Sequence, residues 1–241
     1  MVFVNYAHRG ASEYLPENTM LAFYTGIYMG ANGIETDVQR TKDGILVLFH
    51  DDTLKRVTGQ PGSVGDYTFE ELQAFDVSKN GFTDKITAFE DFLKHFSHWD
   101  ITFAIELKGA GVERDTAVLL RKYGLQKKTV VTSFTFEYLR TFRQYAPEFQ
   151  IGYLTESTDD ATLDQLKAIG GEEYCPEAHL MTPELVAKWH DAGFRVRAWG
   201  VYNEDLMRHA CACGADGMTV NFPDKLTAYL QKEKELWNKK L

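Results

Sequence analysis

Short apolar runs that alternate with amphipathic helical segments recur along the whole chain, and this alternation restricts the fold more than any other feature. Eight runs rich in β-branched and aromatic residues predict strands, at 2–7, 33–39, 101–107, 129–134, 149–154, 172–175, 195–201 and 217–220. Eight strand–helix units predict an α/β fold, a closed parallel (β/α)8 TIM barrel, with its site at the carboxyl ends of the strands. A doubly wound open sheet is the alternative, but no Gly-x-Gly-x-x-Gly follows the first strand.

The length of 241 residues fits one barrel, since barrels of this size commonly form a single domain. We therefore expect one domain over residues 1–241. Residues 51–86 show no strong strand pattern and contain Gly59, Pro61, Gly62 and Gly65, followed by a short helix near 68–75. This segment is predicted to be a small insertion after the second barrel strand, lying over the barrel mouth.

The most informative stretch for chemistry is 2–51. The first strand stops at the turn-prone His8-Arg9-Gly10, so His8 and Arg9 are expected at its carboxyl end. In the second strand Glu35 and Asp37 are two residues apart and share one face. Two carboxylates on an inward face repel each other unless a cation lies between them, and Mg²⁺ or Ca²⁺ is the natural candidate.

A hairpin brings a second histidine to the same place. Asp43-Gly44 predicts a turn, after which 45–49 runs back antiparallel and sets His50 opposite Asp37 or a close neighbour. Taken alone, an acidic pair is more often a solvated strand face and a histidine is more often structural. The apolar character of both strands favours the functional interpretation.

Three later strand ends add further candidates. Glu106 and Lys108 share a face at the end of the strand 101–107, where a purely structural ion pair is the simpler interpretation. Phe134 and Trp199 lie near the ends of the fourth and seventh strands, where each lines either the pocket mouth or the core.

These motifs resemble those of a known family. HRGASEYLPENT, GIETDVQ and LVLFHDD are similar to the signature region of the glycerophosphodiester phosphodiesterases. AIELKG, VVTSF, FRVRAWGVYN and GADGMTVNFPD follow in the family's order, so the resemblance covers essentially the whole chain.

The resemblance implies metal-dependent hydrolysis of glycerophosphodiesters to sn-glycerol 3-phosphate and an alcohol. It implies one divalent cation, either Mg²⁺ or Ca²⁺, and two histidines that share acid and base roles in an unassigned order. The implied residues are His8 and His50 for proton transfer, Glu35, Asp37 and Glu106 for the metal, Lys108 near the phosphate and Trp199 against the glycerol. Arg9 is added as a cation suited to an anionic phosphodiester, and Phe134 as an aromatic residue expected at the pocket mouth.

Two other functions stay open at this point. A lysophospholipase D-like phosphodiesterase of the same barrel group would share the two histidines but accept a long acyl chain. A non-catalytic binding protein would keep the fold without turnover. The presence of every motif residue argues against the binding protein.

The resemblance implies a small-molecule substrate as the partner, and composition bears on the other classes of partner. The formal charge of −9 disfavours nucleic acid as a partner. Cys175, Cys211 and Cys213 are an odd number without disulfide-framework spacing, and no signal peptide is recognised, so we expect a cytoplasmic protein. The uncharged segment 18–34 is short and interrupted by asparagine and glycine, so stable membrane insertion is not expected. An oligomer remains open.

Overall fold

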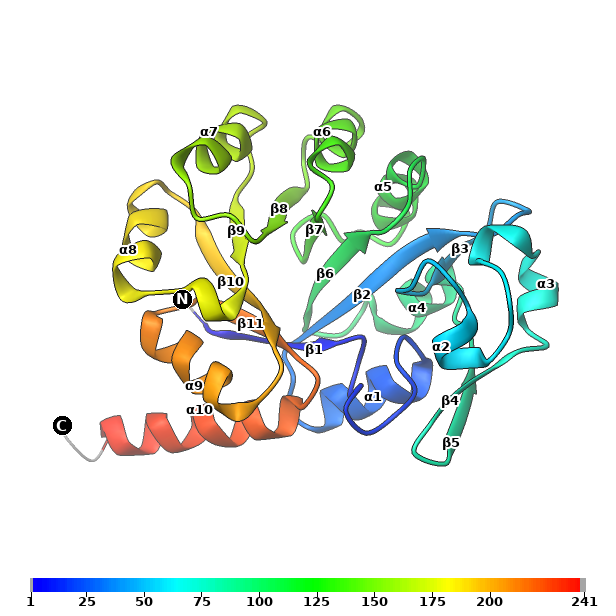
Figure 1. Ribbon diagram of the computed structural model, residues 1–241, viewed down its shortest axis with the longest axis horizontal. Helices are drawn as coiled ribbons and strands as arrows, with labels where there is room; N and C mark the ends of the chain where they lie inside the picture. Colours follow the sequence, from blue (N-terminus) through cyan, green and yellow to red (C-terminus); the bar gives the residue numbers. More distant parts are fainter. Residues whose placement is uncertain (1, 239–241) are drawn as a thin grey trace.

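Eight parallel strands close into a barrel in the computed structural model, which describes residues 2–238 (Figure 1). The strand order around the barrel is β1-β2-β6-β7-β8-β9-β10-β11, and β11 pairs with β1 to close it. The predicted barrel is thus confirmed. Its strands are β1 (Val4–His8), β2 (Gly33–Arg40), β6 (Thr102–Leu107), β7 (Thr129–Ser133), β8 (Gln150–Thr155), β9 (Glu173–Pro176), β10 (Arg195–Val201) and β11 (Gly217–Val220).

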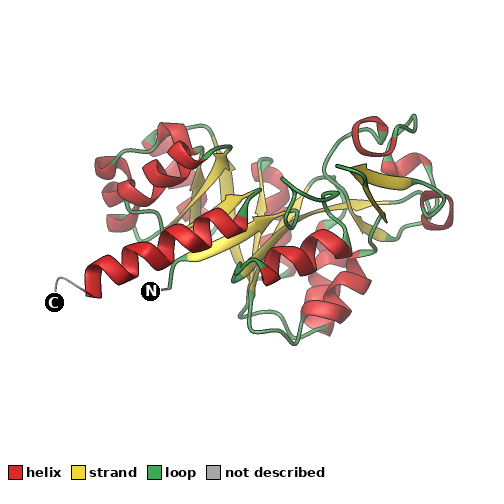
Figure 2. Cartoon of the chain, turned by 90° about the horizontal axis from the view of Figure 1, so that it is seen from below, coloured by secondary structure: helices red, strands yellow, loops and turns green. Residues whose placement is uncertain are grey.

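Helices follow the barrel strands and lie around them (Figures 1 and 2). Thr19, Thr182 and Asn203 each cap a helix by accepting a hydrogen bond from a backbone N–H of the first turn. Within the described part of the chain, none of the helices combines the length and apolar character needed to cross a membrane. The outer helices are α1 (Met20–Tyr28), α4 (Phe89–Phe96), α5 (Glu113–Lys122), α6 (Phe136–Tyr145), α7 (Asp160–Ala168), α8 (Pro183–Asp191), α9 (Glu204–Cys213) and α10 (Pro223–Asn238), with the short 3₁₀ helix η2 (Ala178–Leu180) before α8.

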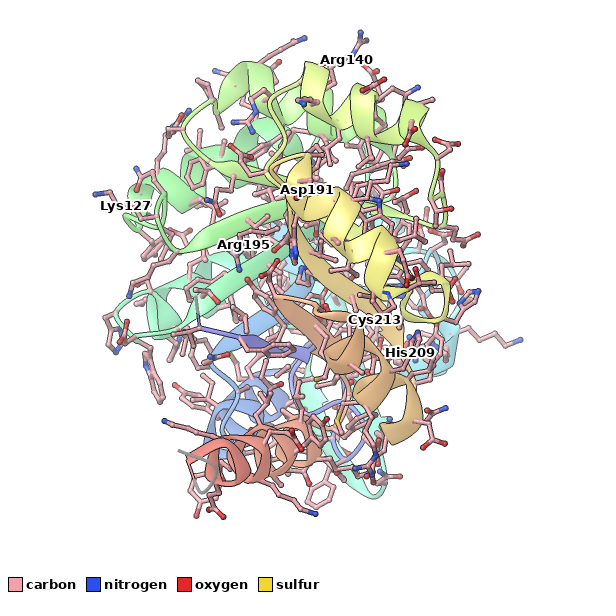
Figure 3. All side chains as sticks on the ribbon, turned by 90° about the vertical axis from the view of Figure 1, so that its left-hand side faces the viewer. Lys127, Arg140, Asp191, Arg195, His209 and Cys213 are labelled. Atoms are coloured by element: carbon pink, nitrogen blue, oxygen red, sulfur yellow. The ribbon has the colours of Figure 1, made fainter. Side chains whose placement is uncertain are left out.

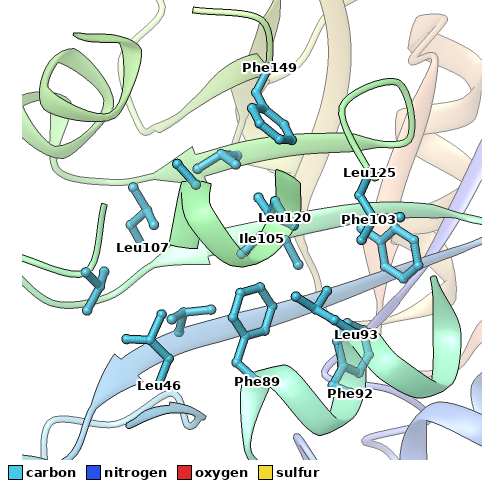
Figure 4. Packing of buried hydrophobic residues seen from close by; sticks show 14 of the residues in the cluster. Leu46, Phe89, Phe92, Leu93, Phe103, Ile105, Leu107, Leu120, Leu125 and Phe149 are labelled. Carbon is cyan, nitrogen blue, oxygen red and sulfur yellow. The ribbon is translucent and has the colours of Figure 1, made fainter. Parts of the chain in front are cut away.

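Apolar side chains fill the layer between the barrel and these helices. One cluster joins β2, β6 and β7 to α4, α5 and α6, and Figure 4 shows Phe89, Phe92 and Leu93 of α4 facing Phe103 and Ile105 of β6. A second cluster joins β9, β10 and β11 to α8, α9 and α10. The outer helices therefore cover the barrel through two apolar clusters, one over β2, β6 and β7 and the other over β9, β10 and β11.

Charged side chains extend from the outer ring into solvent. Lys127 and Arg140 are exposed and point away from the barrel in Figure 3. One cation lies inside instead: Arg197 of β10 is 2% exposed, and its Nε lies 2.8 Å from Oε2 of Glu173. A buried ion pair of this kind fixes geometry more than it adds stability.

The insertion 51–86 packs beside β2 at one end of the molecule (Figure 1). It contains α2 (Lys55–Thr58), the 3₁₀ helix η1 (Val64–Asp66), α3 (Phe69–Leu72), and the antiparallel hairpin of β4 (Asp76–Lys79) and β5 (Phe82–Lys85). The expectation of no strand in this segment was wrong. Asn80 and Gly81 have φ of 54° and 82°, which gives the two-residue turn typical of a tight hairpin.

The accessory strand β3 (Leu46–Leu48) runs antiparallel to β2, as predicted. The backbone N–H of Phe49 donates to the carbonyl oxygen of Asp37 at 3.0 Å, so His50 lies one residue beyond the position opposite Asp37. Val47 and Phe49 are buried in an apolar cluster with Leu54 and Val77 of the insertion. The insertion therefore anchors the strand that carries His50.

Candidate active site

A pocket opens at the carboxyl ends of the barrel strands, the end predicted for the site. Its volume of about 220 Å³ admits a small molecule. Asp37 and Lys108 do not line the pocket but lie behind it, where they contact Arg9 and Glu106. The predicted residues that line the pocket are His8, Arg9, Glu35, His50, Glu106, Phe134 and Trp199.

Three buried carboxylates converge at its base. Glu35 and Asp37 lie on the inner face of β2, and parallel pairing with β6 sets Glu106 in register with Asp37. One oxygen from each residue lies within 4.8 Å of the others. Among the described residues, Oδ1 of Asp37 is buried without a hydrogen-bond partner. An orphaned carboxylate oxygen and an all-oxygen donor set fit a hard divalent cation.

Mutual repulsion and burial perturb these acids. Burial, together with the charge of Asp37, raises the pKa of Glu35 well above its usual range and that of Glu106 to about 7. Burial would also raise the pKa of Asp37, but the charges of Arg9, His50 and Lys108 and the hydrogen bond from Asn18 together outweigh it, so the pKa of Asp37 is lowered. Asp37 is therefore the carboxylate that stays ionised most readily.

Two cations flank the carboxylates. Nε of Arg9 lies 3.2 Å from Oδ2 of Asp37, and Nζ of Lys108 lies 3.0 Å from Oε1 of Glu106. The backbone N–H of Arg9 also donates to Oε2 of Glu35 at 3.2 Å. Cations beside a pocket that also holds acidic groups suit an anionic substrate whose negative charge increases during reaction.

His8, the last residue of β1, is oriented by Asn221, which follows β11. Nδ1 of His8 lies 2.6 Å from Oδ1 of Asn221, and the hydroxyl of Ser12 donates to the same oxygen at 2.9 Å. Because that oxygen is an acceptor, Nδ1 carries the proton and Nε2 is left for the pocket. Burial and the nearby charge of Arg9 lower the pKa of His8 to about 3, so the ring is neutral.

His50 is oriented by a carboxylate instead of an amide. Its Nδ1 lies 2.7 Å from Oδ1 of Asp51. The hydrogen bond from Arg56 to Asp51 lowers the pKa of Asp51 to about 2, so Asp51 accepts and Nδ1 of His50 donates. Both histidines thus keep Nε2 free to exchange a proton in the pocket.

Aromatic rings form one wall of the pocket. Phe134 follows β7 and Trp199 lies in β10, and their rings meet edge to face with centroids 4.8 Å apart. The indole N–H of Trp199 donates to the carbonyl oxygen of Thr155 at 3.3 Å, which fixes the ring plane. The wall offers an apolar surface to the carbon skeleton of a ligand.

Sequence reasoning missed several residues that orient the site. Asn18, whose Nδ2 donates to Oδ2 of Asp37 at 2.9 Å, and Asn221 are not among the predicted site residues. Asn221 offered a signal because it directly follows β11, and Asn18 lies in the loop that joins β1 to α1. Asp51 and Arg56 were assigned only to the insertion, and no local pattern links Arg56 to Glu17, 39 residues earlier.

Comparison with known proteins gives a consistent result. Residues 8–225 match the model of the glycerophosphoryl diester phosphodiesterase family. The chain is 32% identical over 232 residues to the glycerophosphodiester phosphodiesterase of Bacillus altitudinis, covering 91% of this chain and 95% of that one. It is 29% identical over 235 residues to the enzyme of the same name from Caldanaerobacter subterraneus subsp. tengcongensis, covering 94% and 97%.

Solved structures share the architecture. A glycerophosphodiester phosphodiesterase from Agrobacterium tumefaciens superposes with a TM-score of 0.83 at 26% identity, covering 95% of this chain and all of that one. A phosphodiesterase from Oleispira antarctica, solved in complex with its product sn-glycerol-3-phosphate, superposes with a TM-score of 0.85 at 24% identity, covering 94% and 96%.

Proposed function

The chain belongs to the glycerophosphoryl diester phosphodiesterase family and is a glycerophosphodiester phosphodiesterase, and we propose that a divalent cation held by Glu35, Asp37 and Glu106 supports its reaction. The products are sn-glycerol 3-phosphate and an alcohol such as choline or ethanolamine. The observation that carries the proposal is the convergence of three buried carboxylates within 4.8 Å of one another. The insertion shares an apolar cluster with β3, which supports one domain over the whole chain.

The carboxylate cluster supports the metal. The three buried carboxylates repel one another when ionised, and a cation between them would relieve that repulsion. The orphaned Oδ1 of Asp37 provides a lone pair for such a ligand. A bound Mg²⁺ or Ca²⁺ would supply charge stabilisation to the oxygens of the substrate phosphate. Arg9, which lines the pocket, binds and orients that phosphate, and Lys108 adds positive charge from its place behind Glu106.

In this proposal His8 and His50 divide the proton transfers, and the difference between their partners supports one order of roles. The ionised carboxylate of Asp51 stabilises a protonated His50, so His50 gives a proton to the leaving alkoxide. His8 pairs with the neutral amide of Asn221 and is unprotonated at Nε2 before the reaction, so it is the group available to accept a proton from the nucleophile. The glycerol part of the substrate lies against Trp199 and Phe134.

The direct test uses chelator-stripped protein with glycerophosphocholine or glycerophosphoethanolamine. Release of sn-glycerol 3-phosphate is followed with a coupled dehydrogenase before and after Mg²⁺ or Ca²⁺ is restored. Release that depends on one of the ions supports the proposal and identifies the ion. Folded protein that releases no product with either ion contradicts it.

A further inference from the structure

Arg56, in the short helix α2 of the insertion, makes two bidentate contacts with carboxylates that adjoin His50 and Arg9. Its Nε and Nη2 donate to the two oxygens of Asp51 at 2.6 and 2.8 Å. Its Nη1 and Nη2 donate to the two oxygens of Glu17, both at 2.7 Å. We propose that Arg56 is a positioning residue that orients both His50 and Arg9 for the phosphodiesterase reaction, an inference that rests on the function proposed above.

The link to His50 runs through Asp51. The carboxylate of Asp51 accepts from Nδ1 of His50 at 2.7 Å while both its oxygens are held by Arg56. The backbone on either side of His50 is fixed separately, because Nε2 of Gln39 donates to the carbonyl oxygens of Phe49 and Asp51 at 3.0 and 2.9 Å. The hairpin therefore places the backbone of His50, and the Arg56–Asp51 pair sets the rotation of its ring.

The link to Arg9 runs through Glu17. Oε1 of Glu17 accepts from Nη1 of Arg9 at 2.9 Å as well as from Arg56. Arg9 in turn lies against Asp37 at the base of the pocket. Hydrogen-bond donors and acceptors thus alternate from His50 through Asp51, Arg56 and Glu17 to Arg9, and the insertion contributes the central cation.

The same cluster has a competing interpretation as a second cation site. Glu17, His50 and Asp51 have ligand atoms within 4.8 Å of one another. All four carboxylate oxygens of Glu17 and Asp51, however, accept hydrogen bonds from the guanidinium of Arg56. The guanidinium therefore occupies the place that an ion would take.

Stability alone is a weak reason for this arrangement. The side chain of Arg56 is 51% exposed, and ion pairs at such positions add little to the free energy of unfolding because solvent screens them. A planar guanidinium can engage two carboxylates in two bidentate pairs at once, whereas the single ammonium of lysine cannot. If Arg56 orients its neighbours, lysine cannot replace it. If Arg56 contributes only its charge, lysine can.

The first test compares R56A and R56K with R121A. Arg121 is the matched control, because it makes a bidentate pair with Glu148 on the outer helix ring, far from the pocket. We expect R56A to lower kcat about 10- to 100-fold on glycerophosphoethanolamine with the metal restored, a loss typical of displaced orienting groups. In R56A the KM should change less than kcat. R56K should show most of the same loss of kcat, and added guanidinium should partly restore the kcat of R56A.

R121A should retain the kcat of the unaltered protein. If R56A keeps wild-type kcat, or if R56K restores it fully, Arg56 does not position the site. R56A could also lose activity because it loses helical structure. A fall in kcat that parallels a fall in helical circular dichroism, and that guanidinium does not restore, would mean that Arg56 acts only on folding. That outcome would also overturn the proposal.

A second test does not depend on turnover. In ¹⁵N-labelled protein, His50 should carry its ring proton on Nδ1, with the signal assigned by its loss in H50Q. R56A should shift this signal or speed its exchange with solvent, and R121A should leave it unchanged. An unchanged His50 signal in R56A would refute the positioning role. The His50 signal can be measured even if the unaltered protein fails to cleave glycerophosphodiesters. The positioning role of Arg56 and the proposed function can therefore fail independently of each other.

Discussion

Arg9 and Asn18 approach the same carboxylate oxygen, Oδ2 of Asp37, at 3.2 and 2.9 Å. Both residues have left-handed backbone conformations, with φ of 54° and 58°, and the N–H of Asn18 donates to the carbonyl oxygen of Arg9 at 3.0 Å. Such conformations are unfavourable outside glycine and recur where a site requires them. Their combined effect is to hold Oδ2, which leaves Oδ1 of Asp37 for a cation.

The first prediction concerns Asn18. N18D keeps a residue that tolerates the left-handed conformation but replaces the donor that faces Asp37 with a repelling carboxylate. We expect affinity for the divalent cation to fall about 10- to 100-fold, as measured by calorimetric titration of chelator-stripped protein. T36V removes only the hydrogen bond from Thr36 to Oδ1 of Asn18 and should weaken binding less. Equal affinity in N18D and wild type would exclude Asn18 from orienting the site.

The second prediction separates the two histidines. H8Q and H50Q should each lower kcat about 10²- to 10⁴-fold, since each removes one proton transfer. With a nitrophenyl ester of glycerol phosphate, whose leaving group needs no proton, H50Q should regain most of its lost rate and H8Q should not. The opposite pattern would exchange the two roles. Comparable rates for both variants and wild type would remove both residues from the chemistry.

The third prediction concerns metal removal and pH. The folded-state pKa of Glu106 is about 7, whereas glutamate in an unfolded chain titrates at about 4.3. As pH rises above the pKa of the unfolded chain, the metal-free fold loses stability, because the folded state disfavours the ionised form of Glu106. This loss of stability is complete once the pH exceeds the folded-state pKa. E106Q should raise the Tm of metal-free protein at about pH 8, with a gain that shrinks towards about pH 5.

Adding Mg²⁺ or Ca²⁺ should then raise the Tm of wild-type protein more than that of E106Q, because the variant lacks one ligand. Thermal melts at both pH values, with and without the ion, measure both effects. A lower Tm for metal-free E106Q at the higher pH would show that the carboxylates do not repel one another as their burial implies.

The fourth prediction concerns Gly10. Its φ is +84°, and a Cβ added there would lie 2.4 Å from the carbonyl carbon of Ala22. G10A should lower the free energy of unfolding by about 2–4 kcal/mol, because it adds a clash to the backbone penalty. G193A is the control, since Gly193 has φ of +93° and the described residues leave the space around its Cβ open, so it should cost only about 1–2 kcal/mol. Equal losses of unfolding free energy for G10A and G193A in urea titrations would mean that the loop around Gly10 rearranges and relieves the clash.

Much of the barrel could be predicted because its determinants are local. Short runs rich in β-branched and aromatic residues marked the barrel strands, and the shared face of Glu35 and Asp37 followed from the pleat of β2. The β4–β5 hairpin was missed although Asn80-Gly81 carries a strong turn signal, because its flanking residues are largely exposed and do not alternate clearly.

The orienting contacts could not be read from local patterns. The bond between Arg56 and Glu17 joins the insertion to the loop after β1, and the bond between His8 and Asn221 joins the two ends of the chain across the barrel closure. Such pairs depend on the three-dimensional path of the chain, which periodicity does not contain. Residue type and position at strand ends predicted which side chains lie near the pocket, and the partners of each had to come from the structure.

The apolar cluster that includes Val47 and Phe49 has a consequence for chimeric enzymes. The same cluster buries Leu54, Val77 and Ile86 of the insertion, so β3 and the insertion share one small core and should open together in hydrogen exchange. His50 belongs to this unit, whereas His8 belongs to the barrel. An exchange of the insertion between relatives should therefore move residues 45–86 as one module, and the graft boundary between the two histidines should be drawn at the β2–β3 turn.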